Sequence, residues 1–353
     1  MICCEECFKD EEIRAIIKGL QVKGDCQVCS NTDGYVYDTD KNKELSSNFD
    51  EILDVYTSVK NLPDNFPKEK LSMIKDELHD NWNIFNVDKE KVYMLLKSIC
   101  HDKFFETPEL FDYPVGISEL VNEEYLLENS LLKTFQWLDF VNEIKSNIRF
   151  HTNIINTNVL SKLCKSSITY FKKGDLFYRA RIATKDGFGI NEMGPPPNEK
   201  ATNGRANPAG ISCLYLADGT KTAIHEIKAA LYDYVNIGTF QLKEDIAVVD
   251  FSGLDKISPF ILKYLELKDY IINKDHLRKI GADIGKPLRR NDSSLDYLPT
   301  QYIVDFIKSE EHIGIKYNST VYKKGYNLAI FKSDLFECKE VQLVEVKKVS
   351  YEY

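Results

Sequence analysis

The chain has 353 residues, of which 43% are hydrophobic, 12% aromatic and 29% charged. This composition is typical of a globular protein and excludes a disordered or fibrous chain. The sequence has no run of about 18 uncharged apolar residues, so we expect no membrane span. It opens with acidic rather than basic residues (Met1-Ile2-Cys3-Cys4-Glu5-Glu6), which predicts a cytoplasmic protein and not a secreted one.

The net charge of −9 is unevenly distributed. Residues 1–165 carry 19 basic and 30 acidic side chains, whereas residues 166–353 carry 27 basic and 25 acidic ones. Broad binding to nucleic acid depends on Lys and Arg, so the acidic first half argues against it. The change near residue 165 also predicts a domain boundary.

Five of the nine cysteines lie within the first 29 residues. Cys4 and Cys7 form one short pair, and Cys26 and Cys29 form a second. Two such pairs are typical of a structural zinc site, in which four thiolates fill the tetrahedral coordination and leave no position for water. Cys3 could replace Cys4 as a ligand, and a set of free thiols is the alternative to zinc. The other cysteines are isolated and are expected to pack as small apolar residues: Cys100, Cys164, Cys213 and Cys338.

The N-terminal part up to residue 45 is predicted to be a zinc-ribbon-like segment. Residues 8–20 have an acidic first turn and an apolar stripe, which predicts a short helix between the two cysteine pairs. Residues 30–48 are polar and predict a linker or a short hairpin.

Residues 46–165 have helical periodicity and predict an α-helical bundle. Expected helices start at Asn48 or Asp50, at Pro67 and after Asp88, and the longest covers 117–148 with a break near Asn129. A last helix is expected over 157–165.

Residues 166–353 change in character, and short β-rich runs become frequent. Strands are expected over 167–171, 175–182, 212–217, 235–242, 246–251, 313–317, 327–332 and 340–347. Helices are expected over 220–231, 257–268 and 295–310. The predicted fold class is therefore α+β, with a mixed α/β domain after the zinc-binding segment and the helices.

Arginine is scarce, at 8 residues against 38 lysines, and three of the eight lie close together: Arg179, Arg181 and Arg205. A chain that uses Lys for general charge is expected to place Arg where a planar fork must hold phosphate or carboxylate. Pairing with acidic neighbours is the alternative. Strand alternation puts Arg179 and Arg181 on one face and Tyr178 on the other.

Five short motifs follow one another in the second half. They are Tyr178-Arg179, Gly204-Arg205-Ala206-Asn207-Pro208-Ala209-Gly210, Tyr215-Leu216-Ala217, Ala223-Ile224-His225-Glu226 and Tyr317-Asn318-Ser319. In this order they resemble the RES domain family, over about residues 166–338. The preceding helices resemble an extension related to HEPN folds, but the Arg and His pair that HEPN nucleases use is missing from this sequence. A nuclease role is therefore not expected.

The resemblance implies a fold similar to that of ADP-ribosyltransferases and an enzyme that degrades NAD or transfers ADP-ribose. It also implies a toxin with a separate antitoxin. Glu226, Arg205 and Ser319 are the implied catalytic residues. The implied residues for NAD binding are Tyr178, Arg179, Arg205, Asn207, Tyr215 and Ser319.

These residue types suit cleavage of the bond between nicotinamide and ribose. That reaction develops positive charge on the ribose, which a carboxylate such as Glu226 can stabilise. An ordinary exposed helix glutamate is the alternative for Glu226, and a loop-capping serine is the alternative for Ser319. His225 is expected to serve in packing. The acceptor of the ribosyl group (water, phosphate or a protein) and the oligomeric state stay open, and a non-enzymatic zinc-ribbon interaction module is the alternative function.

Overall fold

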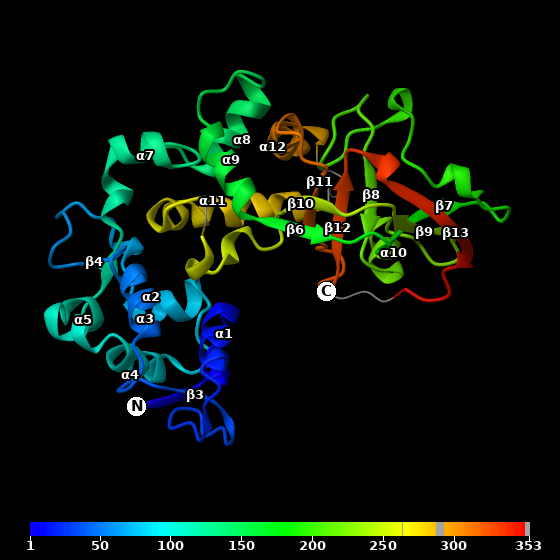
Figure 1. Ribbon diagram of the computed structural model, residues 1–353. Helices are drawn as coiled ribbons and strands as arrows, with labels where there is room; N and C mark the ends of the chain where they lie inside the picture. Colours follow the sequence, from blue (N-terminus) through cyan, green and yellow to red (C-terminus); the bar gives the residue numbers. More distant parts are fainter. Residues whose placement is uncertain (263, 287–292, 350–353) are drawn as a thin grey trace. The chain divides into compact units, whose positions relative to one another are not determined.

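The computed structural model describes residues 1–262, 264–286 and 293–349. The chain forms two compact units, each made of two segments (Figure 1). Unit 1 comprises Met1–Ser130 and Lys256–Asn273, and unit 2 comprises Leu131–Asp255 and Lys274–Tyr353. The three-part division at residues 45 and 165 stays a prediction.

Unit 1 begins with a small antiparallel sheet in which β3 lies between β1 and β2. Asp10 caps the first helix, because its carboxylate accepts hydrogen bonds from two N–H groups of the first turn. The predicted helix over 8–20 is thereby confirmed, with slightly shorter bounds. The elements are β1 (Ile2–Cys4), α1 (Glu11–Gly19), β2 (Lys23–Gly24) and β3 (Gly34–Asp38).

Short helices make up most of the rest of unit 1. Asp88 caps α4 as expected, and its side chain accepts a hydrogen bond from the Lys91 N–H. The prediction of one helix starting at Pro67 is wrong in its length. Ser72 and Val115 exchange backbone hydrogen bonds of 3.1 and 2.8 Å, which keeps the chain extended there and leaves only short helical turns on either side. The elements are α2 (Glu44–Leu53), β4 (Thr57–Ser58), α3 (Ile74–Asp76), α4 (Lys89–Ile99), α5 (His101–Glu106), α6 (Glu109–Asp112), β5 (Val115–Gly116) and α7 (Glu123–Asn129).

The predicted helix over 117–148 is two helices with a break between them, as expected near Asn129. The break contains Lys133, which has a left-handed φ of 55°, and Gln136 caps the second helix. The second helix is α8 (Trp137–Ser146), and α9 (Thr157–Ser166) confirms the last predicted helix of this region.

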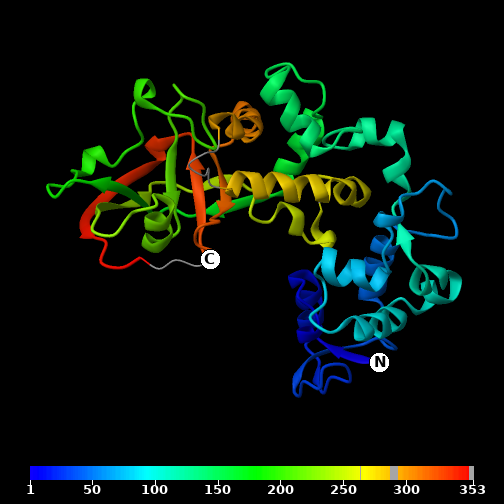
Figure 2. The ribbon, with the colours of Figure 1, turned by 180° about the vertical axis from the view of Figure 1, so that it is seen from behind.

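Unit 2 is built on an eight-stranded sheet, seen from both sides in Figures 1 and 2. The strand order is β13-β9-β7-β8-β12-β11-β10-β6, and every pair is antiparallel except β10 with β11. All eight predicted strands are present. They are β6 (Ile168–Phe171), β7 (Leu176–Ala183), β8 (Leu214–Ala217), β9 (Tyr234–Leu242), β10 (Ile246–Asp250), β11 (Gly314–Asn318), β12 (Tyr326–Ile330) and β13 (Phe336–Glu345).

Among the described residues, the sheet of unit 2 carries a larger and a smaller hydrophobic cluster. The larger cluster includes Phe177, Leu214, Phe240, Val248 and Leu328. The smaller one consists of small and β-branched side chains, among them Ala180, Ala217, Ala223, Val235 and Ile237. Ala223 belongs to α10 (Thr220–Glu226), so this helix packs on the sheet over the smaller cluster.

The predicted helix over 257–268 is wrong. Ser258 and Pro259 start a 3-10 turn instead, and the helix α11 (Leu267–Gly285) begins where the predicted one would end. Its buried Tyr270, Ile271 and Ile272 are consecutive, a pattern that sequence alone cannot distinguish from a buried strand. The helix α12 (Leu298–Ser309) confirms the prediction over 295–310.

Within the part of the chain that is described, every helix is too short or too polar to cross a bilayer.

Candidate active site and metal centre

Four neighbouring strands of unit 2 place one residue each in a single row across the sheet. Ala217 of β8 pairs with Tyr178 of β7 on one side and with Asn327 of β12 on the other, and Asn327 pairs with Tyr317 of β11. Paired residues of neighbouring strands project to the same face. The small Ala217 side chain leaves space between its larger neighbours, and a pocket of about 300 Å³ lies over this row.

The walls of the pocket come from α10, from the loop before β8 and from the turn before α12. The lining residues include Tyr297 and Tyr317, together with five residues of the predicted site: Tyr178, Arg179, Arg205, Tyr215 and Glu226. Aromatic walls with a few charged groups are typical of sites that bind a small molecule.

The loop around Arg205 is held by Asn207, whose side chain is only 5% exposed. The two N–H donors of the Asn207 amide are shared among the carbonyl oxygens of Thr202 (2.9 Å), Pro208 (3.1 Å) and Ile211 (2.9 Å). Its Oδ1 accepts a hydrogen bond of 2.7 Å from the Tyr215 hydroxyl. Asn207 therefore organises the loop.

Position 204 has to be glycine, because Tyr215 and Asn207 leave no space there for a side chain. A Cβ atom at this position would lie 2.5 Å from the Tyr215 hydroxyl and 2.6 Å from Asn207 Oδ1. The backbone of the loop is held from α12 as well, because Gln301 donates to the carbonyl oxygens of Gly204 (2.7 Å) and Asn207 (2.9 Å). The Gly-Arg-x-Asn motif is thus a rigid platform for one arginine.

Arg205 extends from this platform toward Glu226. Its Nη1 donates to the carbonyl oxygens of Ile284 (3.2 Å) and Gly285 (2.8 Å), at the end of α11. Its Nη2 lies 3.9 Å from Glu226 Oε2, and its guanidinium carbon lies 5.5 Å from the centre of the Tyr317 ring. The positive charge is therefore fixed beside the Glu226 carboxylate.

Glu226 is the last residue of α10, because the helix ends there and not at residue 231 as predicted. Lys228 has a left-handed φ of 51°, a conformation that terminates helices. The negative end of the helix dipole disfavours a carboxylate at this position. Glu226 is consequently not placed there to stabilise its helix.

The two oxygens of the Glu226 carboxylate have different surroundings. Oε1 accepts hydrogen bonds from the Ser319 hydroxyl (2.7 Å) and from the Asn327 amide (2.6 Å). Oε2 is the oxygen closest to Arg205. Two donors on one oxygen fix the orientation of the carboxylate, while 23% of the side chain stays exposed. Ser319 is 4% exposed and contacts Glu226 from outside the pocket lining.

Arg179 lines the pocket together with Tyr178, although strand alternation predicted the two side chains on opposite faces. The Arg179 Nη1 donates to the carbonyl oxygens of Met193 (2.7 Å) and Gly194. Burial, together with the nearby charge of Arg181, lowers the pKa of Arg179 to about 10, so the group stays charged at neutral pH. Arg181 donates to the carbonyl oxygen of Glu192 and lies over the ring of Phe188. Both arginines thus hold the loop that follows β7.

Burial is also the main cause that raises the pKa of the two tyrosines beside Arg205. The pKa of Tyr215 and that of Tyr317 both lie well above the ordinary value. These hydroxyls stay protonated near neutral pH and act as polar, uncharged groups of the pocket.

Five of the predicted residues line one pocket: Tyr178, Arg179, Arg205, Tyr215 and Glu226. Ser319 and Asn207 lie behind it, the first on Glu226 and the second under the loop. Sequence reasoning missed Asn327 and Tyr297. For Asn327, an amide directly before the apolar run Leu328-Ala329-Ile330 was a usable signal.

The predicted cysteine set lies together in unit 1. The sulfur atoms of Cys4, Cys7, Cys26 and Cys29 all lie within 4.8 Å of one another. The sulfur atoms of Cys4 and Cys7 are 3.9 Å apart, those of Cys4 and Cys29 3.4 Å, and those of Cys7 and Cys26 3.5 Å. Zn–S bonds of about 2.3 Å in a tetrahedron require sulfur atoms about 3.8 Å apart, so the cluster has the size that zinc needs.

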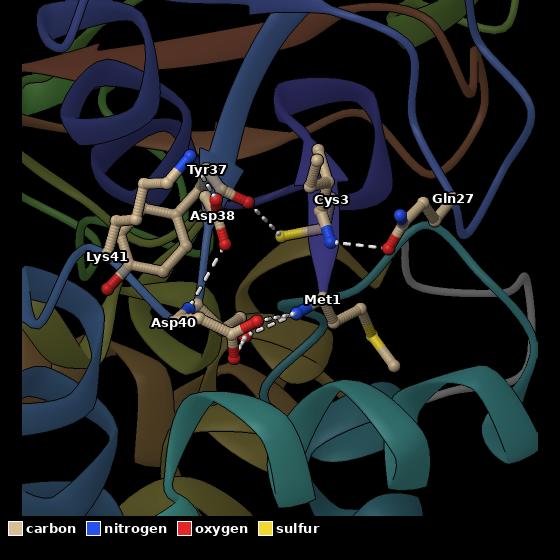
Figure 3. A network of polar contacts seen from close by, with 9 residues as sticks. Met1, Cys3, Gln27, Tyr37, Asp38, Asp40 and Lys41 are labelled. Atoms are coloured by element: carbon tan, nitrogen blue, oxygen red, sulfur yellow. Dashed lines mark hydrogen bonds and ion pairs between the residues drawn. The ribbon is translucent and has the colours of Figure 1, made fainter.

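The alternation of side chains along β1 determines which of Cys3 and Cys4 has its sulfur in the cluster. Neighbouring residues of a strand point to opposite faces. The Cys3 sulfur points to the carbonyl oxygen of Tyr37, at 3.8 Å, as Figure 3 shows. Cys4 has its sulfur in the cluster.

N–H groups surround the cluster as well. The Val28 and Cys29 N–H groups donate to the Cys26 sulfur, at 3.3 and 3.4 Å, and the Asn31 amide lies 3.7 Å from the Cys4 sulfur. Such donors stabilise thiolates and orient metal ligands.

A model of the RES domain matches residues 176–352, half of the chain. Among solved structures, the chain is similar to the crystal structure of the M. tuberculosis MbcT-MbcA toxin-antitoxin complex, with 12% sequence identity and a TM-score of 0.32. The similarity covers 52% of this chain and 91% of the other chain. Among curated proteins, none matches.

Proposed function

Because the chain belongs to the RES domain family, we propose that it is an enzyme that consumes NAD. The bond that breaks joins the nicotinamide nitrogen to C1′ of the ribose. Nicotinamide leaves as a neutral molecule, and the acceptor is water, phosphate or a protein side chain. The products are accordingly free ADP-ribose, ADP-ribose 1-phosphate or an ADP-ribosylated protein.

The environment of Glu226 is the observation that carries this proposal. Cleavage leaves positive charge on the ribose, as in glycoside hydrolysis. Ser319 and Asn327 both donate to Oε1, so the carboxylate is oriented before the substrate arrives. Preorganised charge of this kind stabilises a transition state without further rearrangement.

The size of the pocket suggests which part of NAD it holds. A volume of about 300 Å³ is at the lower end of the range of small-molecule sites. We place the nicotinamide and its ribose in the pocket and the ADP part at the mouth. Tyr178 and Tyr297 are the candidates for stacking against the nicotinamide ring.

Arg179 and Arg205 are our candidates for binding the pyrophosphate. Each uses Nη1 for carbonyl oxygens of the protein. A guanidinium has five N–H donors, so these contacts leave others available for a substrate. Arg205 has the additional role of balancing the Glu226 charge.

Incubation of the purified full chain with NAD tests the proposal. Chromatography should detect nicotinamide that accumulates with time, and mass spectrometry of the second product should identify the acceptor. Addition of phosphate and of a protein mixture distinguishes the three reactions. Intact NAD under all of these conditions would leave the non-enzymatic interaction module as the better reading.

For the cysteine cluster we propose one structural zinc ion, held by Cys4, Cys7, Cys26 and Cys29. The distances between the sulfur atoms and the N–H donors around them support it. A Cys26→Ser, Cys29→Ser double variant should lose the zinc and the folding free energy that zinc contributes to the N-terminal segment. Cys338→Ser, in unit 2, is the matched control and should keep one zinc per chain. Metal analysis of wild-type protein purified without chelator that finds far less than one zinc per chain would contradict the assignment.

The family resemblance also supports a toxin role, with a separate antitoxin protein as partner. Expression of the wild type should deplete cellular NAD and stop growth, and the Glu226→Gln variant should do neither.

A further inference from the structure

An aromatic pair lies directly beside Glu226, on the surface of unit 2. The rings of His225 and Tyr322 are nearly parallel, with 14° between the ring planes and 5.3 Å between the centres. Neither residue lines the pocket. His225 belongs to α10, and Tyr322 belongs to the loop 319–325 that connects β11 to β12.

This loop determines the direction of the Ser319 hydroxyl. The Tyr322 N–H donates to Ser319 Oγ at 3.1 Å, so that oxygen is already an acceptor. The single hydroxyl hydrogen is then free for Glu226 Oε1, at 2.7 Å. A carboxylate can only accept, which fixes this assignment of the proton. The position of the Tyr322 backbone therefore decides whether Ser319 donates to Glu226.

The loop is closed on itself and packs on α10. The Ser319 N–H donates to the Gly325 carbonyl oxygen, and the Gly325 N–H donates to the Tyr322 carbonyl oxygen, both at 2.9 Å. Gly325 touches the helix so closely that a Cβ atom there would lie 2.2 Å from Thr222 Oγ1. The loop thus contacts α10 at two places, Gly325 on Thr222 and Tyr322 on His225.

We propose that His225 and Tyr322 are positioning residues for Glu226. Their stacking holds the loop 319–325 on α10, and this keeps the Ser319 hydroxyl directed at the carboxylate. The inference rests on the proposed function, but its structural part, the docking of the loop, can be measured without NAD.

Hydrogen–deuterium exchange of the full chain tests the docking. His225→Ala should speed the exchange of the Tyr322 and Gly325 amides by about 3- to 10-fold, the range that an aromatic pair supports. His225→Phe keeps a ring and should restore the protection to within about twofold. Tyr322→Leu is a second variant that removes the stack from the other side and should give the same increase. His101→Ala removes a comparable surface pair with Phe105 in unit 1 and should leave these amides unchanged.

Kinetics test the coupling to Glu226. In His225→Ala the turnover of NAD should fall by about 3- to 10-fold while KM changes less than about twofold, and His225→Phe should recover the rate. With Ser319→Ala already present, His225→Ala should add little, because both act through the same hydrogen bond.

The outcomes separate the two ideas. Unchanged amide exchange in both His225→Ala and Tyr322→Leu, or additive rate losses in the double variant, would overturn the positioning role. If the two variants exchange faster but the wild type cleaves no NAD, the proposed function is refuted and the docking contact stands.

Discussion

Replacement of Asn207 by Ala tests whether this residue organises the loop of the site or binds the nucleotide itself. The side chain is buried, its amide nitrogen shares two N–H donors among three carbonyl oxygens, and its Oδ1 accepts from the Tyr215 hydroxyl. Alanine removes all of these hydrogen bonds and leaves the buried Tyr215 hydroxyl and several carbonyl oxygens without this partner. A buried polar group without a partner costs about 1–3 kcal/mol, so we expect unit 2 to lose about 3–4 kcal/mol of unfolding free energy.

The assay is thermal unfolding followed by circular dichroism, together with nicotinamide release. For a unit of this size, 3 kcal/mol corresponds to a decrease in Tm of about 6–12 °C. Asn203→Ala is the matched control in the same loop. Asn203 is exposed, and its side chain accepts one hydrogen bond from the Ala209 N–H, so its loss should cost at most about 1 kcal/mol. If Asn207→Ala keeps the wild-type Tm and only raises KM for NAD, the loop-organising role is refuted and direct binding is favoured.

Two more predictions concern charged groups of unit 2. Arg205→Lys keeps the charge, but a lysine cannot reach both the Gly285 carbonyl oxygen and Glu226. The kcat/KM for NAD should therefore fall at least about tenfold, and an unchanged value would contradict the role of Arg205. Burial raises the pKa of Asp250, but hydrogen bonds from Lys316, Ser252 and Thr169 outweigh it and hold this pKa below its ordinary value. Ionised Asp250 should therefore contribute to the unfolding free energy above pH about 4, the pKa of the unfolded state. This contribution should disappear as the pH falls through the lower pKa of the folded state. In urea unfolding from pH 7 to pH 3, Asp250→Asn should lack this part of the pH dependence, and identical profiles would argue against it.

Much of the sheet could be predicted because its strands are short, β-rich and separated by turn residues. All eight strands of unit 2 were expected, although several bounds differ by a few residues. The motifs also indicated the pocket, because Tyr178, Arg205 and Glu226 are brought to one place by that sheet and by α10.

The missed features depend on contacts between distant parts of the chain. Asn327 bonds to Glu226 across 101 residues, and Arg205 bonds to the end of α11 across 80. A local pattern carries no information about such pairs. The end of α10 was missed for a similar reason, because a left-handed Lys228 is not signalled by its residue type.

The helix α11 shows a different limit. Its buried residues are spread around the helix, among them Tyr270, Ile271, Leu277 and Ile280. A helix that is buried on several sides has a weak amphipathic pattern. Periodicity therefore placed a helix too early, in the segment that Pro259 interrupts.

We propose above all that the Glu226 carboxylate stabilises the positive charge that develops on the ribose. The most direct test is the single-turnover rate of nicotinamide release by Glu226→Gln compared with the wild type, at saturating NAD and with thermal unfolding as the check on folding. Glutamine keeps an oxygen that accepts hydrogen bonds from Ser319 and Asn327. Loss of the negative charge at the C-terminal end of α10 also removes an unfavourable interaction with the helix dipole. We therefore predict a folded variant that binds NAD about as well as the wild type and releases nicotinamide about 10²–10³ times more slowly. A folded Glu226→Gln protein that releases nicotinamide at the wild-type rate would contradict the claim.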